Sequence, residues 1–346
     1  MSENTATATP VVSRKADGIA DLEPVYSLVE DEFRAINQLI PNQLSSDVAL
    51  VEDIGRYIVD SGGKRLRPLI VLLTSQALGY QEDQHVPLAT VIEFLHTATL
   101  LHDDVVDRSG LRRGKPTANA TWGNAPSVLV GDFLYSRAFQ LMVDLGSLGI
   151  MEVLSKATNT IAEGEVMQLA NVGNCELTEN EYYEVIRCKT ALLFEAASHT
   201  GAMLAQHNDH AIADEQIETM RLFGLHFGMA YQLLDDWLDY NGDSASMGKN
   251  VGDDLAEGKL TLPLIHALKH AEQSDKIVIQ TALKTQNLEA LPNILKIVSA
   301  TGSLDFTRDC AQQHIEVAIQ SLDAVVPNDY QQALIQLSHY SLSRLG

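Results

Sequence analysis

Basic residues are scarce in this chain of 346 residues. It holds 24 lysines and arginines against 46 aspartates and glutamates, which gives a formal net charge of −22. General affinity for nucleic acid or for an anionic membrane requires a basic surface, so we expect neither as a partner. The acidic excess is then either a solvated surface or a set of carboxylates with a chemical task.

Cysteine and long apolar runs are also lacking. The three cysteines are too few and too scattered for a disulfide framework or a zinc site. No window reaches 18 uncharged apolar residues, because the best candidate, 86–101, contains Glu93 and His96; we therefore expect no transmembrane segment. Residues 1–18 are polar and lack the apolar core of a secretory signal. These observations together predict a cytoplasmic protein.

Proline is sparse, with 10 residues, and alternating runs of β-branched residues are few, which favours helices over strands. No Gly/Ser linker or compositional break divides the chain, so we expect one all-α domain over 21–346, a bundle of about 12–14 helices, after a flexible segment at 1–20. The apolar period of 3.6 residues predicts helices over 22–40, 43–60, 66–79, 85–106, 125–144, 148–171, 178–206, 212–240, 260–272, 275–286, 288–300, 303–321 and 328–344.

Carboxylates concentrate at the ends of two apolar helices, in the form Asp-Asp-x-x-Asp. Residues four apart share a helix face, so Asp103 is expected beside Asp107, and Asp235 beside Asp239. Like charges placed in this way repel each other unless cations lie between them, and oxygen ligands at this spacing suit Mg²⁺. With glutamate allowed, 214–218 and 253–257 match as well, so the strict form, found twice, carries the signal. The alternative is two solvated acidic helix ends.

Several of the few cations gather in one stretch around the first acidic cluster. Residues 62–68, GGKRLRP, form a turn that opens a helix, and a helix N-terminus with cationic side chains suits a diphosphate. Arg112 and Arg113 follow the acidic cluster directly, so a surface ion pair with it is an equally good interpretation for them.

Read together, these motifs resemble those of the trans-isoprenyl diphosphate synthases. The matching segments are GGKRLRP, LLHDDVVDRSGLRRGKPT, the pair Lys189-Thr190, YQLLDDWLDY and GKNVGDDLAEGKLTLP, in the family's order over about 20–345. The stretches TANATWGNAPSVLVGDFLYSRAFQ and NTIAEGEVMQL are most similar to bacterial octaprenyl diphosphate synthases. The resemblance implies the isoprenoid synthase fold, in which the helices surround a central cavity, and a homodimer.

The resemblance also implies a reaction and its residues. An allylic diphosphate, with farnesyl diphosphate as the expected starter, ionises and is attacked by isopentenyl diphosphate; repetition gives octaprenyl (C40) diphosphate for a quinone such as ubiquinone. Three Mg²⁺ ions would be held by Asp103, Asp107 and Asp235, supported by Asp104, Asp236 and Asp239. The allylic diphosphate would be bound by Arg112, Lys189, Lys249 and Lys259. The isopentenyl diphosphate would be bound by Lys64, Arg67, His96 and Arg113. Thr190 and Gln232 would add uncharged contacts.

Product length is expected to depend on the residues below the first acidic cluster. Ala98 and Thr99 precede Asp103 by about one helical turn, and their small side chains leave a path open, which argues against a C15 product. A C40 chain needs about 30–40 Å, the length of a helix of roughly 20–25 residues. Phe139 or Met142, in the helix expected at 125–144, would form the floor of that path, or else belong to the ordinary core.

Other functions stay open at this point. The alternative product is another chain of C30–C50 or geranylgeranyl diphosphate. His102-Asp103 on a helix is also found in metal phosphohydrolases, but these need further histidine ligands. A terpene cyclase would not need a second diphosphate seat, and a non-catalytic subunit of a prenyl synthase would be expected to lose an acidic motif or the substrate cations.

Overall fold

The computed structural model describes residues 22–208, 212–241 and 251–343. Its helices are α1 (Glu23–Ser27), α2 (Glu30–Gln43), α3 (Ala49–Asp60), α4 (Leu66–Ala77), α5 (His85–Val106), α6 (Ala118–Trp122), α7 (Asn124–Asp144), α8 (Leu148–Ala170), α9 (Glu179–Ile186), α10 (Leu192–Asn208), α11 (Asp214–Asn241), α13 (Asp253–Ala256), α14 (Leu262–His270), α15 (Gln273–Thr285), α16 (Leu291–Ala300), α17 (Ser303–Ser321) and α18 (Asp329–Leu342). A π-helical segment, η1 (Arg187–Ala191), joins α9 to α10, and short 3₁₀ turns lie at Leu288–Ala290 (η2) and Leu322–Ala324 (η3).

The all-α prediction is confirmed, and the expected helices are present with small differences. The chain has more separate helices than the 12–14 expected, because short ones such as α1, α6 and α13 add to the long ones. The helix expected at 22–40 is broken at Leu28 and Val29 into α1 and α2. The helix expected at 178–206 is α9, η1 and α10 in succession, since one π-helical turn shifts the register without ending the helical path.

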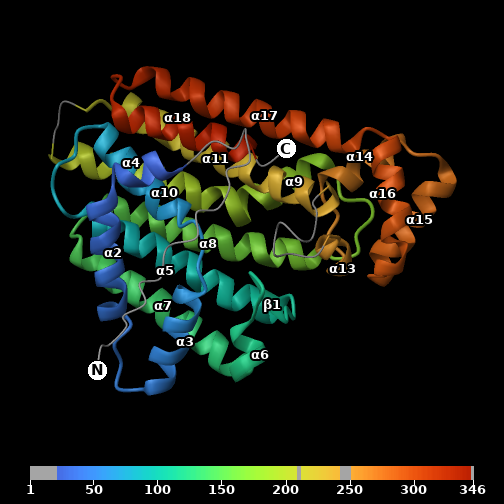
Figure 1. The fold of residues 1–346 in the computed structure, drawn as a ribbon, viewed down its shortest axis with the longest axis horizontal. Coiled ribbons are helices and arrows are strands. Elements are labelled where there is room, and N and C mark those ends of the chain that lie inside the picture. The colour runs from blue at the N-terminus through green and yellow to red at the C-terminus, as the bar shows by residue number, and fades with distance from the viewer. Residues whose placement is uncertain (1–21, 209–211, 242–250, 344–346) are drawn as a thin grey trace, which may run out of the picture.

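The bundle is arranged around α5, α10 and α11. Helix α5 packs against α4 and α7, and α11 packs against α10 and α17 (Figure 1). The main core lies among α2, α4, α5, α7, α8, α10 and the first half of α11. A second core joins the last half of α11 to α9 and α14–α16. The carboxylates near the end of α11 therefore lie beside the second core, among its Leu233, Leu234 and Tyr240.

A small hairpin follows α5, and the sequence did not predict it. Strands β1 (Leu111–Arg112) and β2 (Lys115–Pro116) pair antiparallel, with Arg112 opposite Lys115. The two loop residues, Arg113 and Gly114, have φ of 52° and 75°. Two successive positive φ values are typical of a type I′ turn, whose twist matches that of paired strands. The hairpin brings both arginines back over the end of α5.

Along the described residues, no helix is both long enough and apolar enough to cross a membrane. The segment 1–20, expected to be flexible, lies outside the described residues.

Candidate active site

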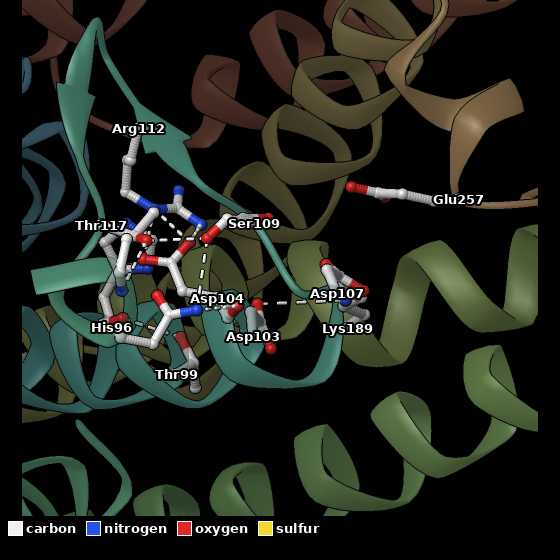
Figure 2. A network of polar contacts seen from close by, with 12 residues as sticks. His96, Thr99, Asp103, Asp104, Asp107, Ser109, Arg112, Thr117, Lys189 and Glu257 are labelled. Carbon is white, nitrogen blue, oxygen red and sulfur yellow. Dashed lines mark hydrogen bonds and ion pairs between the residues drawn. The ribbon is translucent and has the colours of Figure 1, made fainter. Parts of the chain in front are cut away.

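The first acidic cluster divides between two directions at the end of α5. Asp103 and Asp107 lie one turn apart, and the backbone N–H of Asp107 donates to the carbonyl of Asp103 at 2.8 Å. Their side chains are 17% and 22% exposed, whereas that of Asp104 is 1% exposed. Figure 2 shows Asp104 turned toward Arg112, while a dashed line joins Asp103 to Lys189. Two carboxylates are thus open to an approaching ligand, and the third is buried.

Asp104 fixes Arg112 on the hairpin. Nε and Nη2 of Arg112 donate to the Asp104 carboxylate at 2.8 to 3.1 Å, and Asn119 donates to the Asp104 carbonyl at 3.1 Å. Such two-point pairing fixes the plane of the guanidinium as well as its position. The ion pair that the sequence offered as an alternative for Arg112 is therefore present, but its acidic partner is buried rather than on the surface.

Two lysines face the open aspartates. Lys189 Nζ lies 2.6 Å from Glu165 Oε2 and from Gln168 Oε1, and 3.9 Å from Asp103 Oδ2. Lys259 Nζ lies 3.1 Å from Asp107 Oδ2 and also contacts Glu257. The first acidic cluster is thus neutralised by cations that the resemblance assigns to the allylic diphosphate.

Burial and charge shift the pKa values around these lysines. Burial raises the pKa of Asp103; Lys189 opposes the rise and Asp107 adds to it. Burial, followed by the charge of Asp103, raises the pKa of Glu165 to about 7. Burial alone would lower the pKa of Lys259, but Glu257 and Asp107 outweigh it and raise that pKa above its ordinary value. The carboxylates that crowd Lys259 thus keep it charged.

The π-helical segment η1 places Lys189. A Cβ added to Gly164 of α8 would lie 2.8 Å from the Cys188 Cβ and 3.0 Å from the Lys189 backbone nitrogen. Only glycine permits this approach of α8 to η1, and it brings Glu165 and Gln168 within reach of Lys189. Thr190, the next residue, donates to Gln232 Oε1 of α11 at 2.8 Å.

The second acidic cluster, on α11, divides in a similar way. Asp236 accepts hydrogen bonds from the Tyr182 hydroxyl at 2.5 Å and from Gln232 Nε2 at 2.6 Å. Asp239 accepts from the backbone nitrogens of Asp253 and Asp254, at 3.0 and 3.3 Å, at the start of α13. Asp236 and Asp239 are buried, whereas Asp235 is partly exposed.

Carboxylate oxygens of this kind suit a hard cation such as Mg²⁺, which is commonly held by one or two carboxylates plus substrate phosphates. Within the described ranges, no three His, Cys, Asp or Glu side chains converge closely enough to hold a metal by themselves. The donor set therefore fits a metal completed by phosphate oxygens, rather than a site built from protein ligands alone. Asp103, Asp107 and Asp235 are the carboxylates exposed to such a metal.

A separate group of cations lies at the start of α4. Arg67 Nη1 donates to His96 Nε2 at 3.2 Å, and the Arg67 guanidinium lies over the Phe194 ring at 4.0 Å from its centre. Burial, reinforced by Arg67, Arg113 and Arg112, holds the pKa of His96 well below its ordinary value, so this histidine is neutral and its Nε2 accepts.

Two more cations join this group. A Cβ on Gly63, whose φ is 138°, would lie 2.6 Å from Arg113 Nη1, so the hairpin arginine packs directly on the glycine turn. Lys64 Nζ lies 4.7 Å from the centre of the Tyr340 ring of α18. The structure thus brings together Arg67, His96 and Arg113, with Lys64 beside them on the same turn. Lys249 lies outside the described residues.

With this geometry established, the chain was compared with known proteins. Residues 48–300 match the family model described as polyprenyl synthetase. The chain belongs to the polyprenyl synthetase family. It is accordingly a prenyltransferase with an all-α fold, and the metal phosphohydrolase alternative is excluded.

Characterised members of the polyprenyl synthetase family match nearly the whole chain. The octaprenyl diphosphate synthase of Escherichia coli (strain K12) is 48% identical over 325 residues, which cover 94% of this chain and 99% of that enzyme. An all-trans-nonaprenyl-diphosphate synthase of Rhodobacter capsulatus is 43% identical and covers 93% and 98%. The crystal structure of a polyprenyl synthase from Caulobacter crescentus CB15, complexed with calcium and isoprenyl diphosphate, superposes with a TM-score of 0.89 at 40% identity and covers 96% and 99%.

The residues expected to set product length lie in different environments of this polyprenyl synthetase. Ala98 is fully buried, and the Thr99 hydroxyl donates to the His96 carbonyl at 2.7 Å. Met142 is buried in the core, but Phe139 is 37% exposed. Phe139 follows the buried Ala138 by 100° around α7, which places it beside the core face. That Phe139 or Met142 forms the floor of the product path stays a prediction.

Sequence reasoning missed several residues of this site. Tyr182, Glu165 and Gln168 contact functional side chains 21 to 54 residues away, and nothing local in the sequence indicates these contacts. Glu93 gave a usable signal, since it interrupts an apolar run one turn before His96. It was used only to argue against a membrane span.

Proposed function

We propose that this polyprenyl synthetase makes long-chain trans-polyprenyl diphosphates, with octaprenyl (C40) diphosphate as its product. Isopentenyl diphosphate would be condensed head-to-tail onto an allylic diphosphate such as farnesyl diphosphate. The observation that carries the proposal is the pairing of two anion sites. One is lined by open carboxylates and lysines, and the other is lined by arginines and a neutral histidine without carboxylates open to solvent.

The first site suits the allylic diphosphate. Mg²⁺ bound to it would supply positive charge that stabilises the departing pyrophosphate. Asp103, Asp107 and Asp235 would hold the metal, for which three ions stay our expectation. Lys189 and Lys259 would exchange their present carboxylate partners for phosphate oxygens, and Asp104 would keep Arg112 aimed at the same group.

The second site suits isopentenyl diphosphate, which must bind without a metal and therefore needs direct cations. Arg67, Arg113 and Lys64 supply the charge, and His96 holds Arg67. The allylic C1–O bond breaks and pyrophosphate departs with the electron pair. The double bond of isopentenyl diphosphate then forms the new C–C bond, and a proton lost from the adjacent carbon leaves the lengthened allylic diphosphate. No side-chain base is required if pyrophosphate accepts that proton.

The C40 length rests on Ala98 and on the similarity to the Escherichia coli enzyme. Helix α5, at 22 residues, is about 33 Å long, enough to run beside an octaprenyl chain. The nonaprenyl relative has comparable identity, so product length has to be measured. A quinone as the acceptor of the chain, and a cytoplasmic location, stay predictions.

We further propose that two copies of the chain pair through α7 and α8. The exposed faces of these helices carry a group of large apolar side chains, and such a patch is typical of a protein–protein interface. The side chains that are 37% to 66% exposed are Leu129, Phe139, Val143, Val166 and Leu169. Light scattering should give the mass of a dimer, and Leu129→Glu should shift it toward that of a monomer. A monomeric wild-type protein would contradict this assembly.

Incubation of the purified protein with Mg²⁺, farnesyl diphosphate and isopentenyl diphosphate, followed by chain-length analysis, tests the function. We expect octaprenyl diphosphate. An inactive homomer would favour a subunit of a heteromeric synthase, and cyclised hydrocarbon would favour a terpene cyclase. Asp103→Ala tests the metal role: turnover should fall at least about 10³-fold with the far-UV spectrum unchanged. Near-wild-type turnover with Mg²⁺ present would contradict it.

A further inference from the structure

A buried carboxylate lies behind the second anion site. Glu93 of α5 precedes His96 by one helical turn and is buried, with its side chain 12% exposed. Its Oε1 lies 3.7 Å from Arg65 Nε, and its Oε2 is buried with no hydrogen-bond partner among the described residues. A buried carboxylate oxygen left in this state is costly, so its position needs a reason.

The reason lies in the arginines around it. Burial raises the pKa of Glu93, whereas Arg65, Arg67 and Arg113, in that order, lower it. The effect is mutual, because Glu93 raises the pKa of Arg67 and of Arg113 against the effect of burial. Burial, with a smaller contribution from Arg113, still holds the pKa of Arg67 at about 10. Glu93 is thus the anion among three guanidinium groups.

The backbone fixes the geometry of this cluster. Arg65 has a φ of 45°, immediately before α4, and its guanidinium also donates to Asn37 of α2. Arg113 is held by the glycine turn at Gly63, and Arg67 by His96 and Phe194. The arginines approach Glu93 from α4 and the hairpin, but Arg67 Nε has no hydrogen-bond partner within the described part of the chain. The Nε–H group of Arg67 is therefore a donor that a ligand could use.

Arg65 and Arg67 are partly buried and Arg113 is exposed, so removal of the buried Glu93 charge would leave partly desolvated cations uncompensated. When the second anion site, the seat for isopentenyl diphosphate, is empty, Glu93 supplies the negative charge. When a diphosphate is bound, its oxygens supply far more negative charge to Arg67 and Arg113, and the carboxylate then repels the ligand across a short distance of low dielectric. The same side chain therefore stabilises the empty seat and weakens the filled one.

We propose that Glu93 is an internal counter-anion, a positioning residue that stands in for the diphosphate in the empty seat and thereby limits the affinity for isopentenyl diphosphate. The inference rests on the proposed function, in which this seat takes the substrate that binds without metal. In a repeated condensation, moderate affinity allows each new isopentenyl diphosphate to exchange quickly. The charge on Glu93 sets that balance without touching the substrate.

Glu93→Gln tests the inference, because it removes the charge and keeps the shape. The free variant should unfold at a lower temperature than the wild type. Isopentenyl diphosphate added in EDTA should raise the unfolding temperature of the variant by more than that of the wild type. The KM for isopentenyl diphosphate should fall about fivefold, the lower end of ordinary site coupling, while the KM for farnesyl diphosphate stays unchanged.

Two matched variants complete the design. Glu195→Gln removes a similarly buried carboxylate, 14% exposed against 12% for Glu93, that pairs with Arg221 away from the seat; it should lower stability without changing the response to isopentenyl diphosphate. Arg65→Gln removes one of the three arginines around Glu93. The charge of Glu93 then acts on Arg67 and Arg113 alone and competes more strongly with the diphosphate for them, so the KM for isopentenyl diphosphate should rise. This variant keeps the test open if Glu93→Gln does not fold.

A higher KM for isopentenyl diphosphate in Glu93→Gln, or an equal stabilisation of variant and wild type, would overturn the inference, as would an unchanged or lower KM in Arg65→Gln. Failure of the proposed function is separate. If the wild type makes no prenyl chain, but isopentenyl diphosphate still stabilises Glu93→Gln more strongly than it stabilises the wild type, the proposed reaction is contradicted and the counter-anion role is supported. If the wild type makes prenyl chains and Glu93→Gln has the same KM for isopentenyl diphosphate and the same stabilisation by it, the counter-anion role alone is contradicted.

Discussion

The Asp104 carboxylate and the Arg112 guanidinium meet through two nitrogens at 2.8 to 3.1 Å, with the aspartate buried and the arginine 25% exposed. The open side of the pair is therefore the cation, which faces the site from the hairpin. We therefore expect Asp104 to act through Arg112 rather than on a ligand directly, unlike Asp103 one residue earlier.

Asp104→Asn should impair catalysis through Arg112. The amide offers one acceptor oxygen in place of two and no charge, so the guanidinium loses its fixed plane. We expect kcat/KM for the allylic diphosphate to fall about 10²-fold, the usual cost of a misplaced electrostatic group, in steady-state assays. Asp305→Asn, which removes the acidic partner of the exposed pair with Arg308, is the control and should match the wild type. Equal activity of both variants would show that Asp104 does not position Arg112.

Tyr182→Phe should affect the second acidic cluster in the same indirect way. The Tyr182 hydroxyl donates to Asp236 Oδ2 at 2.5 Å inside the protein, so its loss leaves one carboxylate oxygen with fewer donors beside the open Asp235. We expect kcat to fall about tenfold, in line with one lost charge-assisted hydrogen bond. We also expect the Mg²⁺ concentration for half-maximal activity to rise.

The neighbouring Tyr183 offers the control. Its hydroxyl interacts with Cys310 of α17, so Tyr183→Phe also removes a tyrosine hydroxyl from its partner, but one outside the acidic cluster. Its Mg²⁺ dependence should match that of the wild type. A parallel loss in both variants would assign the Tyr182 effect to general stability.

The contrast between these contacts shows what the sequence can and cannot predict. Helix α5 was predicted from its first residue to its last, because a long apolar run bounded by polar residues is a local pattern. Both Asp-Asp-x-x-Asp clusters were equally local. The bond from Tyr182 to Asp236 joins residues 54 apart, and Arg65 meets Glu93 across 28 residues; such pairs depend on how helices pack and leave no spacing to read.

Some local structural features also leave no recognisable pattern in the sequence. The π-helical turn that places Lys189 differs from an α-helix by one residue per turn, which a period of 3.6 does not reveal. The strands of the hairpin have two residues each, too few for an alternating pattern. Both faces of α7 carry apolar residues, so a period of 3.6 does not separate the buried Met142 from Phe139, which is 37% exposed.

Ala98→Tyr should shorten the product. Ala98 is fully buried on α5 about one turn before Asp103, so a tyrosine there would block a growing chain early. We expect products of C15–C20, measured by chromatography of the dephosphorylated prenols, with the rate of the first condensation changed less than about threefold. Ala98→Ser, which keeps the side chain small, should retain the wild-type distribution. An unchanged distribution in Ala98→Tyr would show that the chain does not pass Ala98.

Acid stability should depend on His314. Its Nδ1 lies 2.9 Å from Nδ1 of His226, joining α17 to α11, so one ring donates and the other accepts. Burial, and then His226, lower the pKa of His314 to about 4. A histidine in the unfolded chain titrates near about 6.5. As the pH falls from there toward about 4, the unfolded state binds a proton that the folded state does not, and stability is lost.

His314→Gln should remove this part of the acid sensitivity. Between pH 7 and pH 5, the unfolding temperature of the wild type should fall by about 2–4 °C more than that of the variant, because glutamine has no proton to gain. The variant starts lower at pH 7, having lost one side of the His226 contact, so the two curves should converge as the pH falls. His207→Gln, which changes an exposed histidine, should follow the wild type throughout. Parallel curves for wild type and His314→Gln would mean that this buried pair does not couple folding to protonation.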